Sequence, residues 1–410
     1  MKNGHSRFST EKKVAILHQG FVPTYRVRFY ELLNRESTNH YVVFHGPPPS
    51  NTGYDGLEEK LDFPHVRTKN HELRFFGRTV IYQPVMTTIL FGSYDAVVLG
   101  HEIRFISNVL ILAFFKLLGK PVIWWGQGFE KEQDRKFRAL SQLVEKVKSW
   151  LARSADAYIV YTDGGCQKLI QSRVPKEKIT VVRNTIDMEE QCLLHDKFKN
   201  MDPVQFREEN NLRPDSIVLL YVGRVYREKR LEEILYLVKR INSEKLCRSF
   251  VEVVIIGGGS ELDRLKRIGI GIEGVHFLGE VYDQETIAKF MQISSTLIIP
   301  GKVGLAVNHA FAHGLPVITR QHRHHAPEVE YIVSGENGLI TPGDFDDFLR
   351  ETVDLLNSPE RQKRMSKAAL ETRELLRLDL MVKAFDEATS RAINQKAKTL
   401  VKDLPRAHFH

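Results

Sequence analysis

The chain has 410 residues, of which 42% are hydrophobic and 27% are charged. This composition excludes wholesale disorder, and the length predicts two domains rather than one. The formal net charge of +8 fits a nucleic acid, an anionic membrane or a phosphate-bearing substrate, and its sign alone does not choose among these partners.

The N-terminal segment and the cysteines bear on location. The first residues, MKNGHSRFSTEKK, lack the apolar core of a signal peptide. The apolar run 109–115 is too short for a bilayer, which takes about 20 residues. Cys166, Cys192 and Cys247 show no metal-binding spacing, which predicts reduced thiols. We expect a cytoplasmic chain without a transmembrane helix, acting in solution or at the inner face of a membrane.

Short apolar runs alternate with longer amphipathic segments along the chain, which predicts the fold class. In the first half, predicted strands begin at Val14, Tyr41, Ala96, Pro121, Ala157 and Ile179. In the second half, they begin at Ile217, Val251, Val275, Thr296, Pro316 and Gly338. Continuous apolar runs are typical of parallel strands covered on both faces. The pattern predicts an α/β protein with two doubly wound, Rossmann-like sheets.

The domain boundary is expected where the strand pattern stops. The segment 187–215 shows no strand signal, so we assign 1–186 to the first domain and 187–379 to the second. Ligands of doubly wound sheets bind at the carboxyl ends of the strands. The predicted site is therefore a central cleft between the two domains.

Three polar side chains follow predicted strands of the first domain. Arg26 comes after the first strand and could meet a phosphate. His101 ends another strand, and Gln127 lies in the loop GQG after a third, where it could contact a sugar. A structural role explains each residue equally well.

The segment 136–156 predicts an amphipathic helix with Lys and Arg on its polar face. Its apolar stripe consists of Leu140, Leu143, Val144, Val147, Trp150 and Leu151. A helix packed in the core is favoured, and peripheral contact with an anionic membrane is the alternative.

Two cations follow the first strand of the second domain. Gly223 ends this strand, and Arg224 and Lys229 come directly after it in YVGRVYREKR. They could hold a diphosphate and stabilise its charge as it leaves. A solvated basic turn explains the same residues.

A glycine turn centred on Gly258 ends the next strand, before a helix expected near Ser260. Its backbone N–H groups could face a phosphate or a base, although a tight turn explains it equally. Further along, Gly304 and Leu305 join a strand to a helix that carries His309. This loop predicts an anion pocket, whereas a structural role is favoured for the histidine.

Two carboxylates follow in the segment PEVEY. Glu328 and Glu330 are expected in the first turn of a helix, and either could accept hydrogen bonds from ribose hydroxyls. The nearby His322, His324 and His325 lack the i, i+4 spacing that presents two metal ligands together, so no metal is expected.

The chain resembles the family-4 glycosyltransferases of the GT-B fold, most clearly between about 157 and 340. The segments that carry the resemblance, in the family's order and spacing, are ADAYIVYTDGGCQKLI, ITVVRNTID, YVGRVYREKR, IIGGGSE, VHFLGEV, PGKVGLAVNHAFAHGLPVI and GENGLI. The resemblance implies retaining transfer of a sugar from a nucleotide-diphosphate donor, with no cofactor and no metal. It implies a glycan or lipid-linked acceptor on the first domain, in surface polysaccharide or glycolipid synthesis. A terminal helix, about 380–410, is then expected to pack on that domain.

The resemblance also assigns roles to residues. Arg224 and Lys229 match the cations that replace a metal. Gly258 matches the neighbourhood of the nucleotide base, and the backbone at Gly304 and Leu305 matches the loop that cradles the diphosphate and sugar. Gln127 stands where many members have a histidine that touches the sugar.

Two positions depart from the family. It usually carries two glutamates eight positions apart, the first on the donor sugar and the second on the ribose; Gly301 and His309 occupy those positions here. Glu330 matches another family glutamate by its spacing to Gly335, and Glu328 is an extra carboxylate. We expect one of these two to bind the ribose.

These departures keep other functions open. A nucleotide-sugar epimerase would have the same architecture, and a donor-blind scaffold would explain the loss of both glutamates. Nucleic-acid binding is disfavoured because the positive charge is scattered along the chain.

Overall fold

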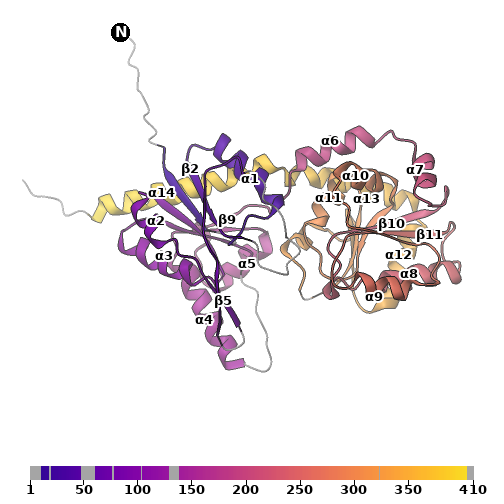
Figure 1. The fold of residues 1–410 in the computed structure, drawn as a ribbon, viewed down its shortest axis with the longest axis horizontal. Helices are drawn as coiled ribbons and strands as arrows, with labels where there is room; N and C mark the ends of the chain where they lie inside the picture. Colours follow the sequence, from indigo (N-terminus) through magenta and orange to yellow (C-terminus); the bar gives the residue numbers. More distant parts are fainter. Residues whose placement is uncertain are drawn as a thin grey trace, which may run out of the picture. The chain divides into compact units, whose positions relative to one another are not determined.

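The structure, a computed structural model, describes residues 11–17, 20–47, 61–75, 78–102, 104–128, 138–322 and 324–403. The chain forms two compact units (Figure 1). Unit 1 comprises Met1–Arg183 and Asp379–His410, and unit 2 comprises Asn184–Leu378. Each unit has its own parallel sheet and its own helices.

Among the described residues, unit 1 has a seven-stranded parallel sheet in the order β3-β2-β1-β6-β7-β8-β9. The strands are β1 (Lys13–Leu17), β2 (His40–His45), β3 (His65–Arg67), β6 (Ala96–Gly100), β7 (Val122–Gly126), β8 (Ala157–Val160) and β9 (Ile179–Val181). All the strand runs predicted for this half are confirmed as strands. The sheet adds β3, and an antiparallel hairpin of β4 (His71–Phe75) and β5 (Arg78–Tyr82) lies outside it.

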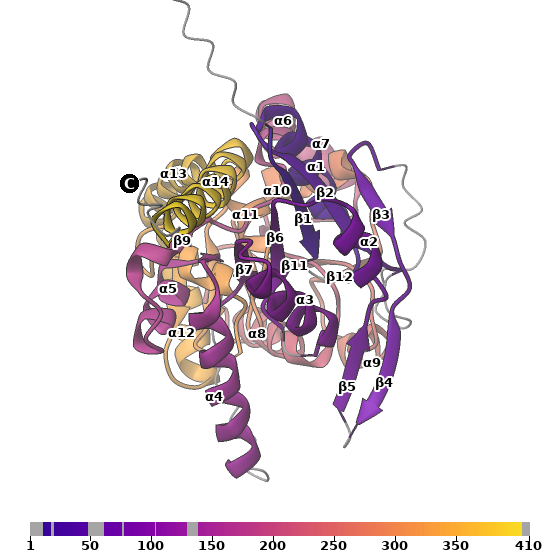
Figure 2. The same ribbon diagram turned by 90° about the vertical axis from the view of Figure 1, so that its left-hand side faces the viewer.

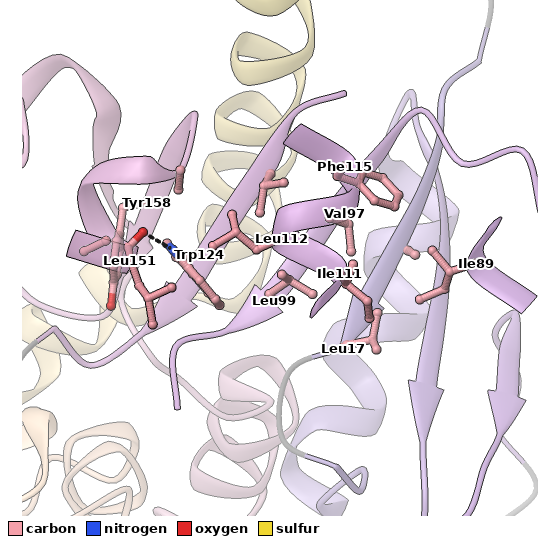
Figure 3. Packing of buried hydrophobic residues seen from close by; sticks show 14 of the residues in the cluster. Leu17, Ile89, Val97, Leu99, Ile111, Leu112, Phe115, Trp124, Leu151 and Tyr158 are labelled. Atoms are coloured by element: carbon pink, nitrogen blue, oxygen red, sulfur yellow. Dashed lines mark hydrogen bonds between the residues drawn. The ribbon is translucent and has the colours of Figure 1, made fainter. Parts of the chain in front are cut away.

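Helices cover both faces of this sheet. One face packs against α2 (Met86–Phe91), α3 (Ile106–Leu117), α4 (Arg138–Ser154) and α5 (Asp163–Gln171) in one apolar core. In that core the indole nitrogen of Trp124 donates to the carbonyl of Leu151 over 2.8 Å (Figure 3). Aromatic side chains facing the core therefore fix the distance between the helices and the strands.

The opposite face carries α1 (Thr24–Glu36) and α14 (Leu378–Asp403). Phe385 of α14 packs against Phe29 and Trp125, with ring centroids 5.4 and 4.8 Å apart. Asp386 accepts a 2.7 Å hydrogen bond from the hydroxyl of Tyr41. These contacts place the last helix of the chain in unit 1.

The predicted amphipathic helix is α4, and the apolar residues predicted for its stripe lie in different environments. Leu140, Leu143 and Val144 lie outside the residues whose side chains are described. Leu151 belongs to the core, whereas Val147 and Trp150 are exposed. The C-terminal half of α4 therefore packs on the sheet with one side and presents apolar groups to solvent with another.

Unit 2 has, within the described residues, a six-stranded parallel sheet in the order β12-β11-β10-β13-β14-β15. The strands are β10 (Ile217–Val222), β11 (Val251–Ile256), β12 (Val275–Gly279), β13 (Thr296–Ile299), β14 (Val317–Arg320) and β15 (Gly338–Thr341). Every strand predicted for this half is confirmed. The order reverses between β10 and β13, which is where doubly wound sheets bind ligands.

Several helices of unit 2 begin at an aspartate that caps the first turn. The helices of this unit are α6 (Met188–Phe198), α7 (Pro203–Glu209), α8 (Glu232–Ser243), α9 (Leu262–Gly269), α10 (Gln284–Ile293), α11 (Ala306–Ala312), α12 (Phe345–Leu356) and α13 (Pro359–Arg373). Asp187, Asp283 and Asp344 each accept backbone N–H groups at a helix start. The helix expected near Ser260 begins at Leu262 without a side-chain cap.

Two general properties of the described residues bear on function. None of their helices is both long and apolar enough to cross a bilayer. Nor do they contain a group of three or more His, Cys, Asp or Glu side chains placed to hold a metal ion.

Candidate functional site

The predicted cations lie in unit 2 where β10 ends, next to the point of reversal. Lys229 ends a short 3-10 turn, Arg227–Lys229, and its ammonium donates to the backbone carbonyl of Lys302 over 2.6 Å. Burial, together with the charges of Lys302 and Arg224, lowers the pKa of Lys229 to about 8, while the carboxylate of Glu328 acts to raise it. A partly desolvated ammonium of this kind interacts strongly with an anion.

Arg224 is exposed and shares an aromatic neighbour with Lys229. The guanidinium lies 5.7 Å from the ring centre of Tyr226, and the ammonium lies 5.5 Å from it. Tyr221 donates to the carbonyl of Arg224 over 2.7 Å and so fixes the backbone there. The structure thus places the two predicted cations beside the same aromatic ring, that of Tyr226.

The glycine turn after β11 packs against the end of β10. A Cβ on Gly257 would lie 1.9 Å from the carbonyl oxygen of Gly223, and one on Gly259 would lie 2.3 Å from that of Val225. Gly258 lies against the side chain of Glu280. Close backbone approach therefore requires these glycines, and the turn joins the Gly223 segment to the loop after β12.

The loop after β13 is hydrogen-bonded to the turn that carries Lys229. The N–H of Gly301 donates to the carbonyl of Lys229 over 3.0 Å, and that of Lys302 donates to Glu228 over 2.8 Å. A Cβ at Gly301 would lie 2.0 Å from the carbonyl oxygen of Glu228. This backbone conformation excludes the glutamate that the family usually has at this position.

A histidine, His325, forms hydrogen bonds with the backbone on the other side of this loop. Nδ1 of His325 accepts from the N–H of Val303 over 3.1 Å, and Nε2 donates to the carbonyl of Arg320 over 2.8 Å. Accepting at one nitrogen and donating at the other requires a neutral ring. Gly304 and Leu305 follow, and the seven-residue α11 begins at Ala306.

The two candidate carboxylates differ in environment. They lie in a 3-10 turn, Pro327–Tyr331, rather than in an α-helix. Glu328 is buried and accepts a hydrogen bond from the amide of Asn184, whereas Glu330 is exposed. Glu328 is therefore the carboxylate whose charge acts on Lys229.

His309 is half-buried on α11. Its Nδ1 is enclosed and has no hydrogen-bond partner among the described residues. Desolvation lowers the pKa of His309 to about 4, so the ring is neutral near neutral pH. A neutral imidazole offers a donor or an acceptor but no charge.

The remaining predicted residues lie in unit 1. Arg26 is enclosed by aromatic rings, with its guanidinium 5.0 Å from the ring centre of Trp125 and Nη1 3.4 Å from the sulfur of Met381. Nδ1 of His101 lies 2.8 Å from the hydroxyl of Tyr158, and burial lowers the pKa of His101 to about 4. Gln127 is exposed at the end of β7.

Sequence reasoning missed three participants: Lys302, His325 and Asn184. Lys302 and His325 act through backbone contacts of the loop, and Asn184 reaches Glu328 across 144 positions. None of these contacts has a local sequence signal beyond the position of the residue in a loop.

The match to a known family covers most of unit 2. Residues 204–372 match the family model described as glycosyl transferases group 1. The matched residues all lie in unit 2. They include Arg224 and Lys229, which follow β10, and Gly301, which follows β13.

Two curated relatives are similar over part of the chain. D-inositol 3-phosphate glycosyltransferase 2 of Catenulispora acidiphila is 28% identical over 233 residues, which cover 53% of this chain and 52% of that protein. An uncharacterized 41.2 kDa protein in the cps region of Klebsiella pneumoniae is 23% identical over 285 residues, or 68% and 73% of the two chains. The aligned part thus spans about half the length of the first relative.

Solved structures show the fold of the whole chain. HepE of Anabaena in complex with UDP has a TM-score of 0.69 at 16% identity and covers 93% of this chain and 100% of its own. Sucrose-phosphate synthase of Thermosynechococcus elongatus has a TM-score of 0.66 at 16% identity, with 94% and 100% covered. The chain therefore has the GT-B fold.

Proposed function

We propose that the protein is a retaining glycosyltransferase that moves a sugar from a nucleoside-diphosphate donor to a glycan or lipid-linked acceptor. The observation that carries the proposal is the fixed pair of cations at the end of β10. Arg224 and Lys229 lie beside one tyrosine, and Lys229 is held by the loop after β13. Cations placed in this way stabilise the pyrophosphate charge that develops as the donor bond breaks.

The other predicted residues take roles around this pair in the proposal. Gly223 and Gly258 let the backbone approach the nucleotide, and the backbone at Gly304 and Leu305 holds the diphosphate and sugar. Glu328 and Glu330 are the candidates for binding the ribose. His309 occupies the position at which the family usually has a ribose-binding glutamate. The two cations replace the charge of a metal, so we propose that no bound metal or cofactor is needed.

In the same proposal, unit 1 receives the acceptor. Gln127 and His101 end neighbouring strands of its sheet and would contact the sugar, while Arg26 supports the adjacent Trp125. Lipopolysaccharide outer core galactosyltransferase WaaB shares the fold, with a TM-score of 0.61 at 16% identity. A relative from a cps region is similar in sequence. Both support a surface polysaccharide or glycolipid as the product, made at the inner face of a membrane.

The central test is donor binding and transfer with UDP-sugars and GDP-sugars. Arg224→Ala and Lys229→Ala should each raise the barrier to transfer by about 2–4 kcal/mol, by analogy with a lost oxyanion donor. Lys367→Ala, which removes an exposed lysine of α13, is the matched control and should transfer normally. Turnover near the wild-type value in both site variants would refute the proposed role.

The same assays separate the alternatives. An epimerase converts the donor in the absence of an acceptor, so an epimer in that incubation would favour it. A donor-blind scaffold, which Gly301 and His309 motivate, binds neither UDP nor GDP in calorimetry. Binding of one nucleotide together with acceptor-dependent release of it supports transfer.

A further inference from the structure

The outer side of the α2–α3–α4 layer of unit 1 is unusual for a surface. The inner sides of these helices share one core, with Ile89 of α2, Ile111 and Phe115 of α3, and Leu151 of α4 (Figure 3). Figure 2 shows the three helices on the same side of the sheet. Their outer sides therefore form one continuous face of unit 1.

The outward stripe of α3 is apolar. Ile106, Leu110, Ala113 and Leu117 are all exposed, and Leu117 keeps 86% of its surface in solvent. They are spaced by three or four residues, which places them on one side of the helix. A surface helix normally turns polar residues outward, so α3 is apolar on both its buried and its exposed sides.

Exposed apolar side chains on the neighbouring helices extend this stripe. Phe91 at the end of α2 is 85% exposed, and Trp150 of α4 is 60% exposed. Lys120 donates to the carbonyl of Tyr94 over 2.5 Å, which joins the segment after α3 to the segment after α2. The C-terminal ends of α2 and α3, which carry Phe91 and Leu117, are therefore close to each other. We call Phe91, Leu110, Leu117 and Trp150 the apolar face.

Cations outnumber carboxylates on the helices of this face, because the described side chains of α3 and α4 include Lys116, Lys146, Lys148 and Arg153 but only one carboxylate, Glu145. The cations on or next to these helices are Lys116, Lys120, Lys146, Lys148, Arg153, Lys178 and Lys396. The carboxylates among the residues that pair with them are Asp156, which Lys116 and Lys396 contact, and Glu145, which Lys148 contacts. Lys146 and Arg153 are exposed on α4.

We propose that the apolar face and its cationic rim dock unit 1 on an anionic lipid bilayer. On such a bilayer, an apolar patch inserts at the boundary between the headgroups and the acyl chains, while Lys and Arg contact the anionic headgroups. Tryptophan is favoured at that interface. A second copy of the chain fits less well, because pairing two such faces would bring the cations of both copies together. The inference deepens the proposed function and rests on it for the identity of the acceptor, since a lipid-linked acceptor lies in such a membrane.

The test is co-sedimentation of the full chain with vesicles, without donor or acceptor. Binding is expected to vesicles of phosphatidylcholine with phosphatidylglycerol, to weaken with salt, and to be far weaker to phosphatidylcholine alone. Leu110→Ser with Leu117→Ser should lower the partition constant by roughly tenfold or more. Lys146→Glu with Arg153→Glu should remove the preference for the anionic vesicles.

Leu193→Ser with Ile270→Ser is the matched control, because both residues are exposed apolar residues of unit 2. It should bind vesicles like the wild type. Trp150 adds a second readout, since Trp124 and Trp125, the other two tryptophans, are buried. A blue shift of emission on vesicle binding, absent in Trp150→Phe, places the contact on α4.

Equal binding by the wild type and the Leu110/Leu117 variant would overturn the proposal, as would no binding to either vesicle. A wild-type dimer in light scattering that this variant dissociates would also overturn it in favour of self-association. Circular dichroism of the same samples reports whether the variants are folded. Nucleotide binding separates the two proposals, because vesicle binding and donor binding can each fail alone.

Discussion

The ammonium of Lys229 donates a hydrogen bond to the backbone carbonyl of Lys302 over 2.6 Å. This contact ties the end of β10 to the loop after β13, on the two strands between which the sheet order of unit 2 reverses. It fixes a cation without neutralising it, because a carbonyl accepts the hydrogen bond but carries no net charge. The positive charge remains available to an anion.

The first prediction concerns pH. The pKa of Lys229 falls from 10.5 to about 8 on folding, so between these values the unfolded chain binds more protons than the folded one. The contribution of Lys229 to the free energy of unfolding therefore rises with pH from about 8 to 10.5. Diphosphate affinity should fall as pH passes about 8, because the ammonium is lost.

Calorimetry with UDP and GDP across this range checks the prediction. Lys229→Arg keeps the charge and should flatten the pH profile, whereas Lys229→Met should remove both the profile and most of the affinity. A wild-type profile identical to that of Lys229→Arg would show that Lys229 does not titrate in the site.

The second prediction concerns Gly301. Gly301→Ala places a Cβ against the carbonyl of Glu228, so we expect a loss of about 1–3 kcal/mol in the free energy of unfolding. Gly304→Ala is the matched control, since the nearest atom to its Cβ would lie 3.9 Å away. Urea unfolding of both variants checks this, and equal stabilities would contradict the close approach. For the same reason, Gly301→Glu should weaken donor binding rather than improve it.

The third prediction separates the two carboxylates. Glu328→Ala removes an acceptor of the buried amide of Asn184 and the charge that opposes the fall in the pKa of Lys229. We expect a cost of about 1–3 kcal/mol in unfolding free energy, together with a further lowering of the pKa of Lys229. Glu330→Ala, at an exposed position, should change stability by less than about 0.5 kcal/mol. If unfolding experiments gave the reverse order, the burial argument would fail.

The fourth prediction concerns His325. Burial lowers the pKa of this ring below its ordinary value of 6.5, so stability is present above that value and is lost as pH falls through the folded pKa. Acidification should therefore disrupt the hydrogen bonds that join His325 to Val303 and Arg320, and should weaken nucleotide binding. His325→Ala should weaken binding at all pH values and remove the acid-side part of the profile. An unchanged acid limb in this variant would assign the loss to another group.

The structure also explains which strands the sequence could reveal. The confirmed strands are continuous apolar runs, because helices cover both faces of a parallel sheet. β3 has three residues with exposed ends, and β4 and β5 form a two-stranded antiparallel pair beside the main sheet. β3 and β4 lack an uninterrupted apolar run and the run in β5 has only three residues, Val80, Ile81 and Tyr82, so the criterion that found the other strands did not detect them.

The residues of the candidate site likewise differ in whether the sequence could reveal them. Arg224 and Lys229 could be named because they directly follow a strand, and the carboxyl end of a strand is fixed by chain direction alone. The carbonyl of Lys302 and the ring of His325 could not be named, because their partners depend on how two loops meet.

The order of apolar and charged residues along the chain was enough to predict the two parallel sheets, their flanking helices and the cations after β10. The folded chain was needed to show that Leu151 is buried while its neighbour Trp150 is exposed, and that Glu328 is buried while Glu330 is exposed. In both pairs the two residues are close in sequence, and the rotation of a helix or turn against its sheet settles which side chain faces the core. That rotation is set by packing among segments far apart in the chain, and no local pattern records it.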